Sequence, residues 1–258
     1  MAVITAETSG PVAVVTLDRP DARNALTGAM VQSLAEAFAV SDADPAVRVV
    51  VLTGRDPAFC AGLDLKDLAR TYDQVGATAG ADGDRSRIGF PRPDKPLIGA
   101  INGPTVTGGL ELALGCDFLI ASERATFADT HARVGVMPAG GLTIRLPRLV
   151  GINRALQMSL TGDFVDAERA CAWGLVNEVV PHGELMGRAM ELAGALAEVD
   201  PAAVSELSAM YASLAFRSDD EAYADEARWS RRWMRDHFDA DTLASRRAGI
   251  IGRGSSRH

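Results

Sequence analysis

The sequence predicts an α/β fold over its first two thirds and a helical region over its last third. Two runs rich in β-branched residues, 12–18 and 47–53, are typical of strands. Segments with helical spacing of apolar residues lie between the predicted strands, which indicates repeated β-β-α units although no sequence repeat is visible. After Gly140 the spacing is helical almost to the end of the chain.

Local signals predict the first elements. The run 12–18 pairs with the short run 3–5 across Ser9-Gly10. A helix is expected over 29–41, with Thr27 as its N-cap and an apolar face formed by Met30, Leu34, Ala37 and Phe38. The continuous run 47–53 suits a strand buried on both faces. Further short strands are predicted at 97–101, 118–121 and 125–127.

The longest apolar stretch, 97–116, has nearly the length of a membrane span. It contains Asn102, Pro104, Glu111, two threonines and five glycines, which a bilayer tolerates poorly. We therefore expect a buried strand, a tight loop and the start of a helix here, and no membrane partner.

The segment 73–93 collects glycines and prolines among small and charged residues. This composition is typical of a surface loop, and it is also typical of a lid over a ligand. The residues alone favour neither interpretation.

Capping signals place the helices of the last third. Asp166 precedes a helix that Gly174 closes, and Asp200 is an N-cap followed by proline at the first helical position. Ser218 and Glu221 form a capping box before an amphipathic helix that carries Trp229 and Trp233. We interpret the two tryptophans as packing or subunit contacts, and we expect the tail 252–258 to be frayed.

Composition excludes several classes of function. The 258 residues carry 34 acidic and 26 basic side chains, a net charge of −8, whereas a duplex-binding protein needs a basic face. Nucleic acid is therefore not an expected partner. The four histidines show no metal-site spacing with the cysteines or with one another, so no metal is expected.

The three cysteines, Cys60, Cys116 and Cys171, are isolated and odd in number. This pattern is typical of reduced thiols in the cytosol. Residues 1–10 have neither a basic region nor a long apolar core, so we expect no secretion signal and a cytoplasmic location.

Two glycine-bearing turns carry the chemistry. In FCAGLDL, at 59–65, Gly62 permits a sharp turn and Asp64 can cap a following helix. Such turns leave backbone N–H groups at a helix N-terminus, where partial positive charge collects. The signal is weak alone, because strand-turn-helix junctions of this composition are common.

The second turn precedes Glu111. Gly108-Gly109 again exposes N–H groups at a helix start, and Glu111 lies on the same helical face one turn later. This glutamate either stabilises its own helix or acts as a general base beside a backbone donor for a developing oxyanion. No nucleophile elbow, P-loop or dinucleotide motif is present in the sequence, and no serine–histidine pair sits at the glycine turns.

Together these segments resemble the enoyl-CoA hydratase/isomerase (crotonase) superfamily over roughly residues 10–215. The matching residues, in order, are LDRPDARNAL at 17–26, FCAGLDL at 59–65, Lys95-Pro96 through Glu111, Cys116-Asp117, Phe127, Gly135, Pro138, Gly140-Gly141, Arg145-Leu146, LTGD at 160–163 and WGLVNEVV at 173–180. Each motif alone is unspecific, but the ordered set is highly specific.

The resemblance implies an α/β spiral of β-β-α units that binds acyl-CoA thioesters over residues 1–195, with a helical trimerisation region at 196–258. It implies a homotrimer or a dimer of trimers, and no cofactor beyond the CoA thioester substrate. The segment 73–93 corresponds to a variable region that shapes the acyl pocket, which favours the lid interpretation.

The resemblance also assigns site residues. The backbone N–H groups of Leu63 and Gly108 correspond to the oxyanion hole that stabilises the thioester enolate. Residues on the CoA side are Ala22, Arg23, Ala61, Asp64, Leu65 and Lys66. Lys66 is one of only two lysines in the chain, and it either faces phosphate or is simply solvated.

The sequence departs from the hydratase pattern at one position. Hydratases of the family use two glutamates, of which Glu111 matches the first, while the position of the second falls on His131. Asp129, two residues earlier, is the alternative. Histidine can donate or accept a proton near neutrality, so Glu111 and His131 can divide the proton transfers of hydration. His131 as a simple loop residue is an equally weighted interpretation.

The resemblance therefore predicts an acyl-CoA-acting enzyme of this family, foremost an enoyl-CoA hydratase of fatty acid metabolism. The alternatives are a one-base reaction such as enoyl-CoA isomerisation and a non-catalytic acyl-CoA-binding protein. Serine proteolysis on a related spiral fold is a remote third class.

Overall fold

The computed structural model describes residues 2–67, 90–214, 217 and 219–237. The chain divides into two compact units, Met1–Ser205 and Glu206–His258, which are described separately. The segment 73–89, Ser218 of the expected capping box and the tail 252–258 lie outside the described residues.

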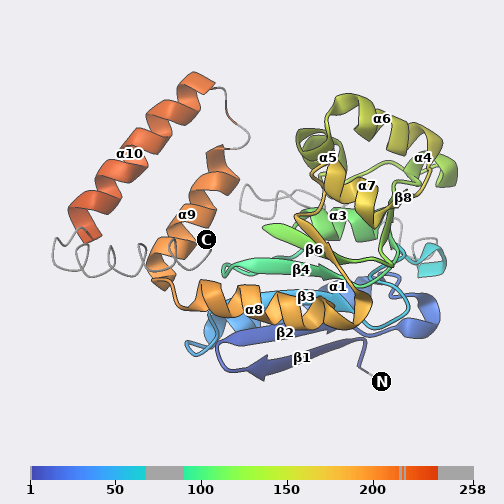
Figure 1. Cartoon of the computed structure of the whole chain (residues 1–258), viewed down its shortest axis with the longest axis horizontal. Helices are drawn as coiled ribbons and strands as arrows, with labels where there is room; N and C mark the ends of the chain where they lie inside the picture. The colour runs from blue at the N-terminus through green and yellow to red at the C-terminus, as the bar shows by residue number, and fades with distance from the viewer. Residues whose placement is uncertain (1, 68–89, 215–216, 218, 238–258) are drawn as a thin grey trace. The chain divides into compact units, whose positions relative to one another are not determined.

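A six-stranded sheet forms the centre of the first unit, in the order β1-β2-β3-β4-β6-β9 (Figure 1). β1 pairs antiparallel with β2, and the other neighbours pair in parallel. The strands are β1 (Ile4–Ser9), β2 (Val12–Leu17), β3 (Val49–Gly54), β4 (Leu97–Ile101), β6 (Phe118–Ser122) and β9 (Glu178–Val180).

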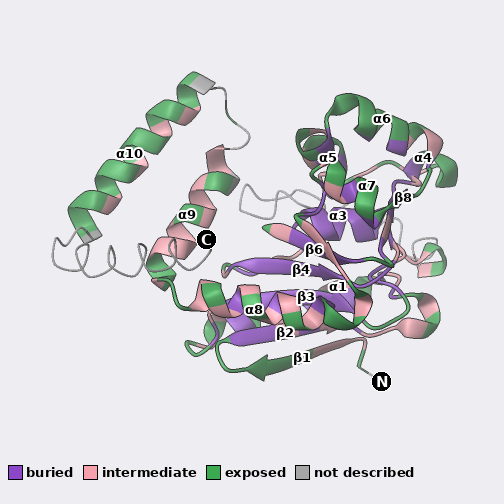
Figure 2. Ribbon diagram, viewed as in Figure 1, coloured by how far each residue is buried: buried purple, intermediate pink, exposed green. Residues whose placement is uncertain are grey.

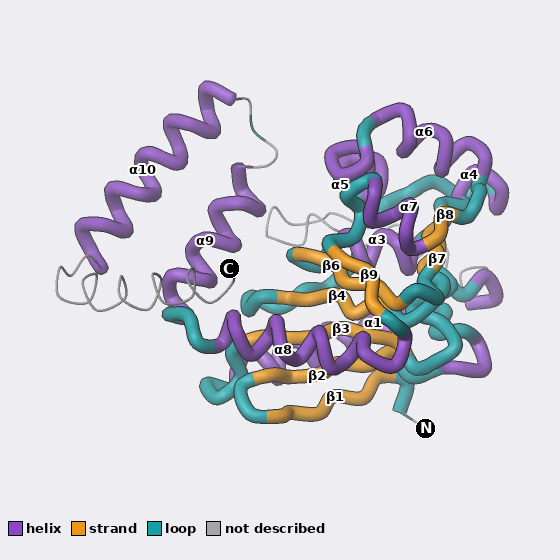
Figure 3. The backbone as a smooth tube through the Cα atoms, in the orientation of Figure 1, coloured by secondary structure: helices purple, strands orange, loops and turns teal. Residues whose placement is uncertain are grey.

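A second, three-stranded sheet lies beside the first, in the order β5-β7-β8 (Figure 3). Its strands are β5 (Thr105–Val106), β7 (Thr126–Ala128) and β8 (Val165–Asp166). The α-helices and 3-10 helices are η1 (Pro20–Ala22), α1 (Gly28–Ala43), α3 (Gly108–Leu114), α4 (His131–Val134), α5 (Leu142–Val150), α6 (Ile152–Thr161), α7 (Ala167–Ala172), η2 (His182–Glu184), α8 (Leu185–Ala197), α9 (Pro201–Leu214) and α10 (Asp219–His237).

Strand β3 is buried on both faces, as its β-branched run predicts (Figure 2). Its side chains alternate between two apolar clusters. Val50 and Leu52 belong to the apolar cluster that includes Met30, Leu34 and Phe38 of α1. Val49 and Val51 belong to a second cluster, with Leu185, Ala189 and Ala193 of α8. Successive strand side chains point to opposite faces, so the two helices cover opposite sides of the sheet.

The predicted local signals are largely confirmed. The strands expected at 12–18, 47–53, 97–101, 118–121 and 125–127 are all present within two residues of those bounds. Thr27 Oγ1 accepts a hydrogen bond from Met30 N at 3.2 Å, and Asp166 Oδ1 accepts one from Arg169 N at 2.8 Å. The apolar stretch 97–116 forms the expected strand, tight loop and helix, and the loop also contains the two-residue strand β5. No described helix is long and apolar enough to cross a membrane.

The last third is less uniformly helical than its spacing predicts. β8 and β9 interrupt it, and β9 adds the sixth strand of the main sheet. β9 is three half-buried residues long, and pairing with β6, where Ile120 lies opposite Glu178, stabilises it. The strand therefore depends on tertiary pairing rather than on a local pattern.

Within the second unit, the indole of Trp229 donates to the Glu206 carboxylate, and the Arg232 guanidinium pairs with the same carboxylate. Trp229 and Trp233 are half-buried. Among the described residues of this unit, the exposed large apolar side chains are Leu207, Tyr211, Tyr223 and Met234.

Candidate active site

The first glycine turn follows β3 and is fixed by short parallel bridges. Cys60 bridges Thr105 of β5, and Leu63 bridges Leu26. Gly62 has φ +94°, and a Cβ there would lie 2.9 Å from the carbonyl oxygen of Val106. Both the backbone conformation and the lack of space therefore require glycine.

The second turn contains backbone strain. Thr107 has φ 53°, which is a rare conformation for a β-branched residue. Its hydroxyl lies 2.6 Å from that of Thr130 and accepts a hydrogen bond from Thr130 N at 3.1 Å. These bonds hold the strained turn against the loop before α4. Backbone strain of this kind persists only where surrounding contacts fix the conformation.

The two turns lie against each other. A Cβ on Gly108 would be 3.4 Å from the backbone nitrogen of Leu63, and a Cβ on Gly109 would be 2.2 Å from the carbonyl oxygen of Cys60. The N–H groups of Leu63 and Gly108 donate no hydrogen bond to another described residue, whereas Asp64 N donates to Leu26 O at 2.8 Å. Unpaired backbone donors are rare inside proteins, so this pair is available to a ligand oxygen.

Glu111 lies one turn along α3, which is buried throughout its length. Only 3% of Glu111 is exposed, and its Oε1 accepts a 2.6 Å hydrogen bond from Gly140 N. Burial raises the pKa of the Glu111 carboxyl, against the opposing effects of the Gly140 N–H and of His131. A carboxyl with a raised pKa suits general acid–base catalysis.

His131 begins α4 and faces Glu111. Its Nε2 is 3.7 Å from Glu111 Oε2, and its Nδ1 is 2.6 Å from Asp129 Oδ1. His131 is 4% exposed and Asp129 is 1% exposed. The structure thus brings together the two predicted proton-transfer residues, and it adds Asp129 behind the imidazole.

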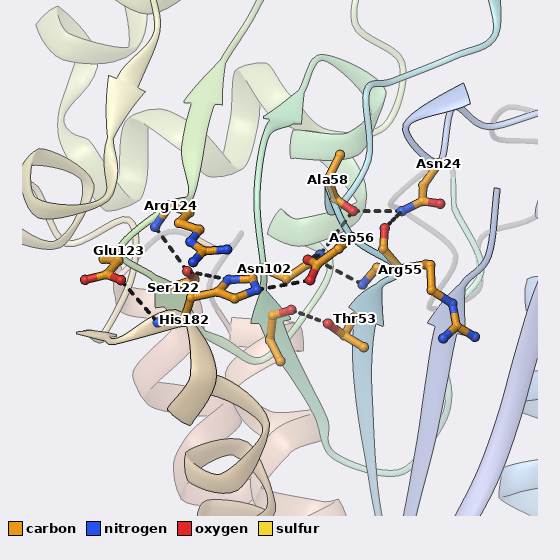
Figure 4. Close-up of polar contacts among 12 residues, drawn as sticks. Asn24, Thr53, Arg55, Asp56, Ala58, Asn102, Ser122, Glu123, Arg124 and His182 are labelled. Carbon is orange, nitrogen blue, oxygen red and sulfur yellow. Dashed lines mark hydrogen bonds and ion pairs between the residues drawn. The ribbon is translucent and has the colours of Figure 1, made fainter. Parts of the chain in front are cut away.

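A polar network braces the loop that leads from β3 into the first turn (Figure 4). On one side Asn24 Nδ2 donates to the carbonyl oxygens of Arg55 and Ala58, at 2.8 and 2.7 Å. On the other side Asn102 Nδ2 donates to Asp56 Oδ1 at 2.8 Å. Hydrogen bonds from two loops, one after η1 and one after β4, therefore fix the approach to Leu63.

The same network contains a serine–histidine–aspartate chain. His182 lies 3.0 Å from Ser122 Oγ and, through its other ring nitrogen, 3.0 Å from Asp56 Oδ2. Ser122 has no exposed surface, and its Oγ accepts a bond from Arg124 N. A nucleophile must reach its substrate, so we interpret this chain as a structural brace rather than a protease triad.

The residues expected on the CoA side lie around the first turn. Ala61 N donates to Arg23 O at 3.0 Å, which places Ala22 and Arg23 beside Ala61. The side chains of Arg23, Leu65 and Lys66 are exposed. The exposed set therefore includes two cations, Arg23 and Lys66.

Asp64 has a different environment from its exposed neighbours. Its carboxylate pairs with Arg19 at 3.0 Å and accepts a hydrogen bond from Lys66 N at 3.0 Å, as an N-cap does. The hydrogen bond from Arg19 holds the pKa of Asp64 below its ordinary value. Asp64 therefore organises the turn, which is consistent with its predicted capping role.

The sequence did not predict three contacts of the site, although Asp129 was already the alternative proton-transfer residue and Gly140 was among the matched residues. Gly140 N binds Glu111, Thr130 binds Thr107, and Asp129 binds His131 through the ring nitrogen. The spacing of Asp129 two residues before His131 was visible, but the direction of its carboxylate was not.

Cys60 and Cys116 are buried, and burial raises the pKa of each thiol to about 12. Neither thiol is therefore a nucleophile at neutral pH. Within 2–67, 90–214, 217 and 219–237, no group of three histidine, cysteine or acidic side chains is placed to hold a metal ion.

Two backbone donors with no partner among the described residues lie beside a buried carboxyl and imidazole, and an arrangement of this class can stabilise an oxyanion while protons move. Comparison with known proteins agrees with this class: the enoyl-CoA hydratase/isomerase family model matches residues 7–238. The chain belongs to the enoyl-CoA hydratase/isomerase family of crotonase-type enzymes that act on acyl-CoAs.

Individual relatives agree in sequence and in fold. Probable enoyl-CoA hydratase 1, peroxisomal, of Arabidopsis thaliana is 44% identical over 188 residues, which cover 73% of this chain and 70% of that protein. Mevalonyl-coenzyme A hydratase of Beauveria bassiana is 40% identical over 202 residues, 75% of this chain and 72% of its own. The enoyl-CoA hydratase structure from Mycobacterium smegmatis superposes with a TM-score of 0.75 at 44% identity, covering 91% and 99% of the two chains.

Proposed function

We propose that this enzyme hydrates 2-enoyl-CoA thioesters by syn addition of water. The observation that carries the proposal is the pair of buried side chains, Glu111 and His131, 3.7 Å apart and next to the turns of Leu63 and Gly108. Hydration needs a base for water, an acid for carbon and donors for the thioester oxygen, and these residues can supply all three.

These groups account for each proton and each bond of the hydration. Ionised Glu111 takes a proton from water while the water oxygen bonds to C3 of the enoyl group. The electron pair of the C2–C3 double bond moves toward the thioester, whose oxygen accepts hydrogen bonds from Leu63 N–H and Gly108 N–H. Protonated His131 then delivers its Nε2 proton to C2, which completes the addition of water.

One proton must return before the next turnover. After hydration Glu111 is protonated and His131 is neutral, and their facing atoms are 3.7 Å apart. Transfer of the proton from Glu111 to His131 Nε2 through one bridging water restores both groups, because the separation is too long for a direct hydrogen bond. The raised pKa of Glu111, which burial causes, supports this proposal because it makes the protonated carboxyl accessible.

The CoA portion is expected to bind on the surface formed by Ala22, Arg23, Ala61, Leu65 and Lys66. Arg23 and Lys66 are exposed cations, and phosphate groups favour such side chains. Asp64 contributes by fixing the turn through Arg19.

A product assay across short, medium and long 2-enoyl-CoA thioesters tests the proposed function. We expect 3-hydroxyacyl-CoA products without added metal or nucleotide, since no cofactor is expected. Saturation with a CoA thioester at 100 times its Kd should also stabilise the fold by about 2.7 kcal/mol, measured as a rise in melting temperature.

Other results of these assays would support one of the alternative functions or contradict the site. Double-bond migration without hydration selects a one-base isomerase, and binding without any product selects an acyl-CoA-binding protein. If no CoA thioester changes the melting temperature, the assignment of this site is wrong.

We also propose that the chain assembles as a homotrimer or a dimer of trimers, with the helical region 196–258 contributing to the interface. Leu207 and Tyr211 support this: they lie four residues apart on α9 and are 54% and 74% exposed. Exposed apolar side chains on one helical face favour burial against another surface. Sedimentation at micromolar concentration should give a mass three or six times that of the 27.2 kDa chain; a monomer would contradict the proposal.

The cytoplasmic location remains a prediction. It is supported by three free cysteines, of which two are buried. Cell fractionation tests it.

A further inference from the structure

Asp129 occupies a buried position directly behind the imidazole of His131. It lies in the loop between β7 and α4, with 1% of its surface exposed. Its Oδ1 is 2.6 Å from His131 Nδ1 and accepts a second bond from the backbone nitrogen of His131 at 3.1 Å. The side chain of Ser159, on α6, also hydrogen-bonds to this carboxylate.

We infer that Asp129 is a positioning residue: its carboxylate fixes the His131 ring in the tautomer that carries hydrogen on Nδ1 and leaves Nε2 facing Glu111. An ionised carboxylate only accepts hydrogen bonds, so the nitrogen that contacts it must carry the hydrogen. The orientation of a histidine by a carboxylate on its far nitrogen is a general way to set which nitrogen exchanges protons.

A protonated Asp129 could donate a hydrogen bond to Nδ1 instead of accepting one, but the environment of Asp129 opposes protonation. Burial pushes the pKa of Asp129 up, yet the hydrogen bonds from the His131 ring, from Ser159 and from the His131 backbone outweigh burial and hold the pKa below its ordinary value. Asp129 is therefore ionised at neutral pH, as the tautomer requires.

The same contacts separate Asp129 from the proton-transfer role that the sequence left open for it. Its Oδ1 is already occupied by two donors from His131. The His131 ring lies between the Asp129 and Glu111 carboxyl groups: its Nδ1 contacts Asp129, and its Nε2 is 3.7 Å from Glu111 Oε2. That separation is too long for a direct hydrogen bond, so Glu111 does not occupy Nε2 and this nitrogen can face substrate.

The inference rests on the proposed function for its kinetic consequence, but its structural content can be measured separately. In full-length protein labelled with 15N-histidine, solid-state NMR reports which ring nitrogen carries hydrogen. We expect neutral His131 to show hydrogen on Nδ1, with its signals assigned by their loss in His131→Ala. Hydrogen on Nε2 with none on Nδ1 in the parent protein would overturn the inference whether or not the enzyme is a hydratase, whereas hydrogen on both nitrogens is the protonated ring and agrees with it.

The variant Asp129→Asn removes the charge and keeps the shape. The neutral amide no longer demands hydrogen on Nδ1, so we expect the Nε2–H tautomer to appear and kcat to fall about 10²-fold or more, with KM changed less than about threefold. Parental kcat together with an unchanged tautomer would contradict the inference. Failure of this variant to fold leaves the parent spectrum as the deciding measurement.

A matched control is Asp163→Asn. Asp163 has a 67% exposed side chain and only a distant, 3.8 Å ion pair with Arg133. We expect this variant to keep the parental kcat and the parental His131 spectrum. If the parent itself shows no turnover, the hydratase proposal fails, while the NMR result still decides the role of Asp129.

Discussion

Glu111→Gln is expected to keep acyl-CoA binding and to lose most turnover, by about 10²–10⁴-fold in kcat. The amide has the shape of the carboxyl, and its oxygen can still accept the 2.6 Å hydrogen bond from Gly140 N. It cannot take a proton from water. The loss should therefore fall on kcat rather than on KM. Steady-state kinetics with the best enoyl-CoA of the panel measures kcat and KM. The melting temperature of the variant at increasing concentrations of the 3-hydroxyacyl-CoA product measures binding.

The same variant should not destabilise the fold. Because burial raises the pKa of Glu111, the folded state favours the protonated carboxyl. The parent therefore loses stability as pH rises through the raised pKa, whereas the glutamine variant does not. Above neutral pH we expect the melting temperature of Glu111→Gln to equal or exceed that of the parent, which separates loss of chemistry from loss of structure.

A second variant, Gly140→Ala, perturbs the Glu111 carboxylate through a neighbouring residue. A Cβ on Gly140 would lie 2.8 Å from Glu111 Cδ and 3.0 Å from its Oε1, so Gly140→Ala must displace the carboxylate. We expect a smaller fall in kcat than in Glu111→Gln. Gly187→Ala on α8, where a Cβ meets nothing within 4 Å, is the matched control. Parental activity in Glu111→Gln would show that the base lies elsewhere.

Much of the fold could be predicted because its signals are local. The β-branched run of β3, the Thr27 and Asp166 caps and the glycines of the two turns each act within a few residues. β9 could not be predicted in the same way. Its three residues have no strand pattern of their own, and they pair with β6, nearly 60 residues earlier in the chain.

In the site, too, some residues have a signal in the sequence and others are placed only by long-range contacts. Glu111 was recognisable as a carboxylate in an apolar run, and the resemblance gave His131 its place. The contact between Gly140 N and Glu111 spans 29 residues, and the brace between His182 and Asp56 spans 126. Contacts of this kind follow from how loops close on one another, which composition and spacing do not determine.

His131 carries the second large effect, because its Nε2 faces Glu111 Oε2 across 3.7 Å and is the proposed proton donor. If His131 delivers the proton to C2, His131→Ala should lose about 10²-fold or more in kcat. Product binding should change little, since the backbone donors at Leu63 and Gly108 remain. An alanine variant that works at the parental rate would make His131 a lining residue and favour a one-base reaction at Glu111.

Placing a glutamate at position 131 should not by itself give the parental kcat. The new carboxylate of His131→Glu would lie next to both Glu111 and Asp129, which contact the present imidazole from its two sides at 3.7 and 2.6 Å. Like charges at such distances disfavour ionisation and strain the site. We therefore expect His131→Glu to remain below the double variant Asp129→Asn/His131→Glu, in which one of the three charges is removed.

The sign of the Asp129→Asn effect is then the decisive measurement. In the parent, Asp129→Asn should lower kcat because the imidazole loses the carboxylate that orients it; in the His131→Glu background it should raise kcat because a competing charge disappears. A double-mutant cycle on kcat isolates this coupling from the separate effects of each substitution. Because a residue that only stabilised the loop would lower kcat in both backgrounds, a decrease in both would show that Asp129 acts on the fold and not on the charge state of residue 131.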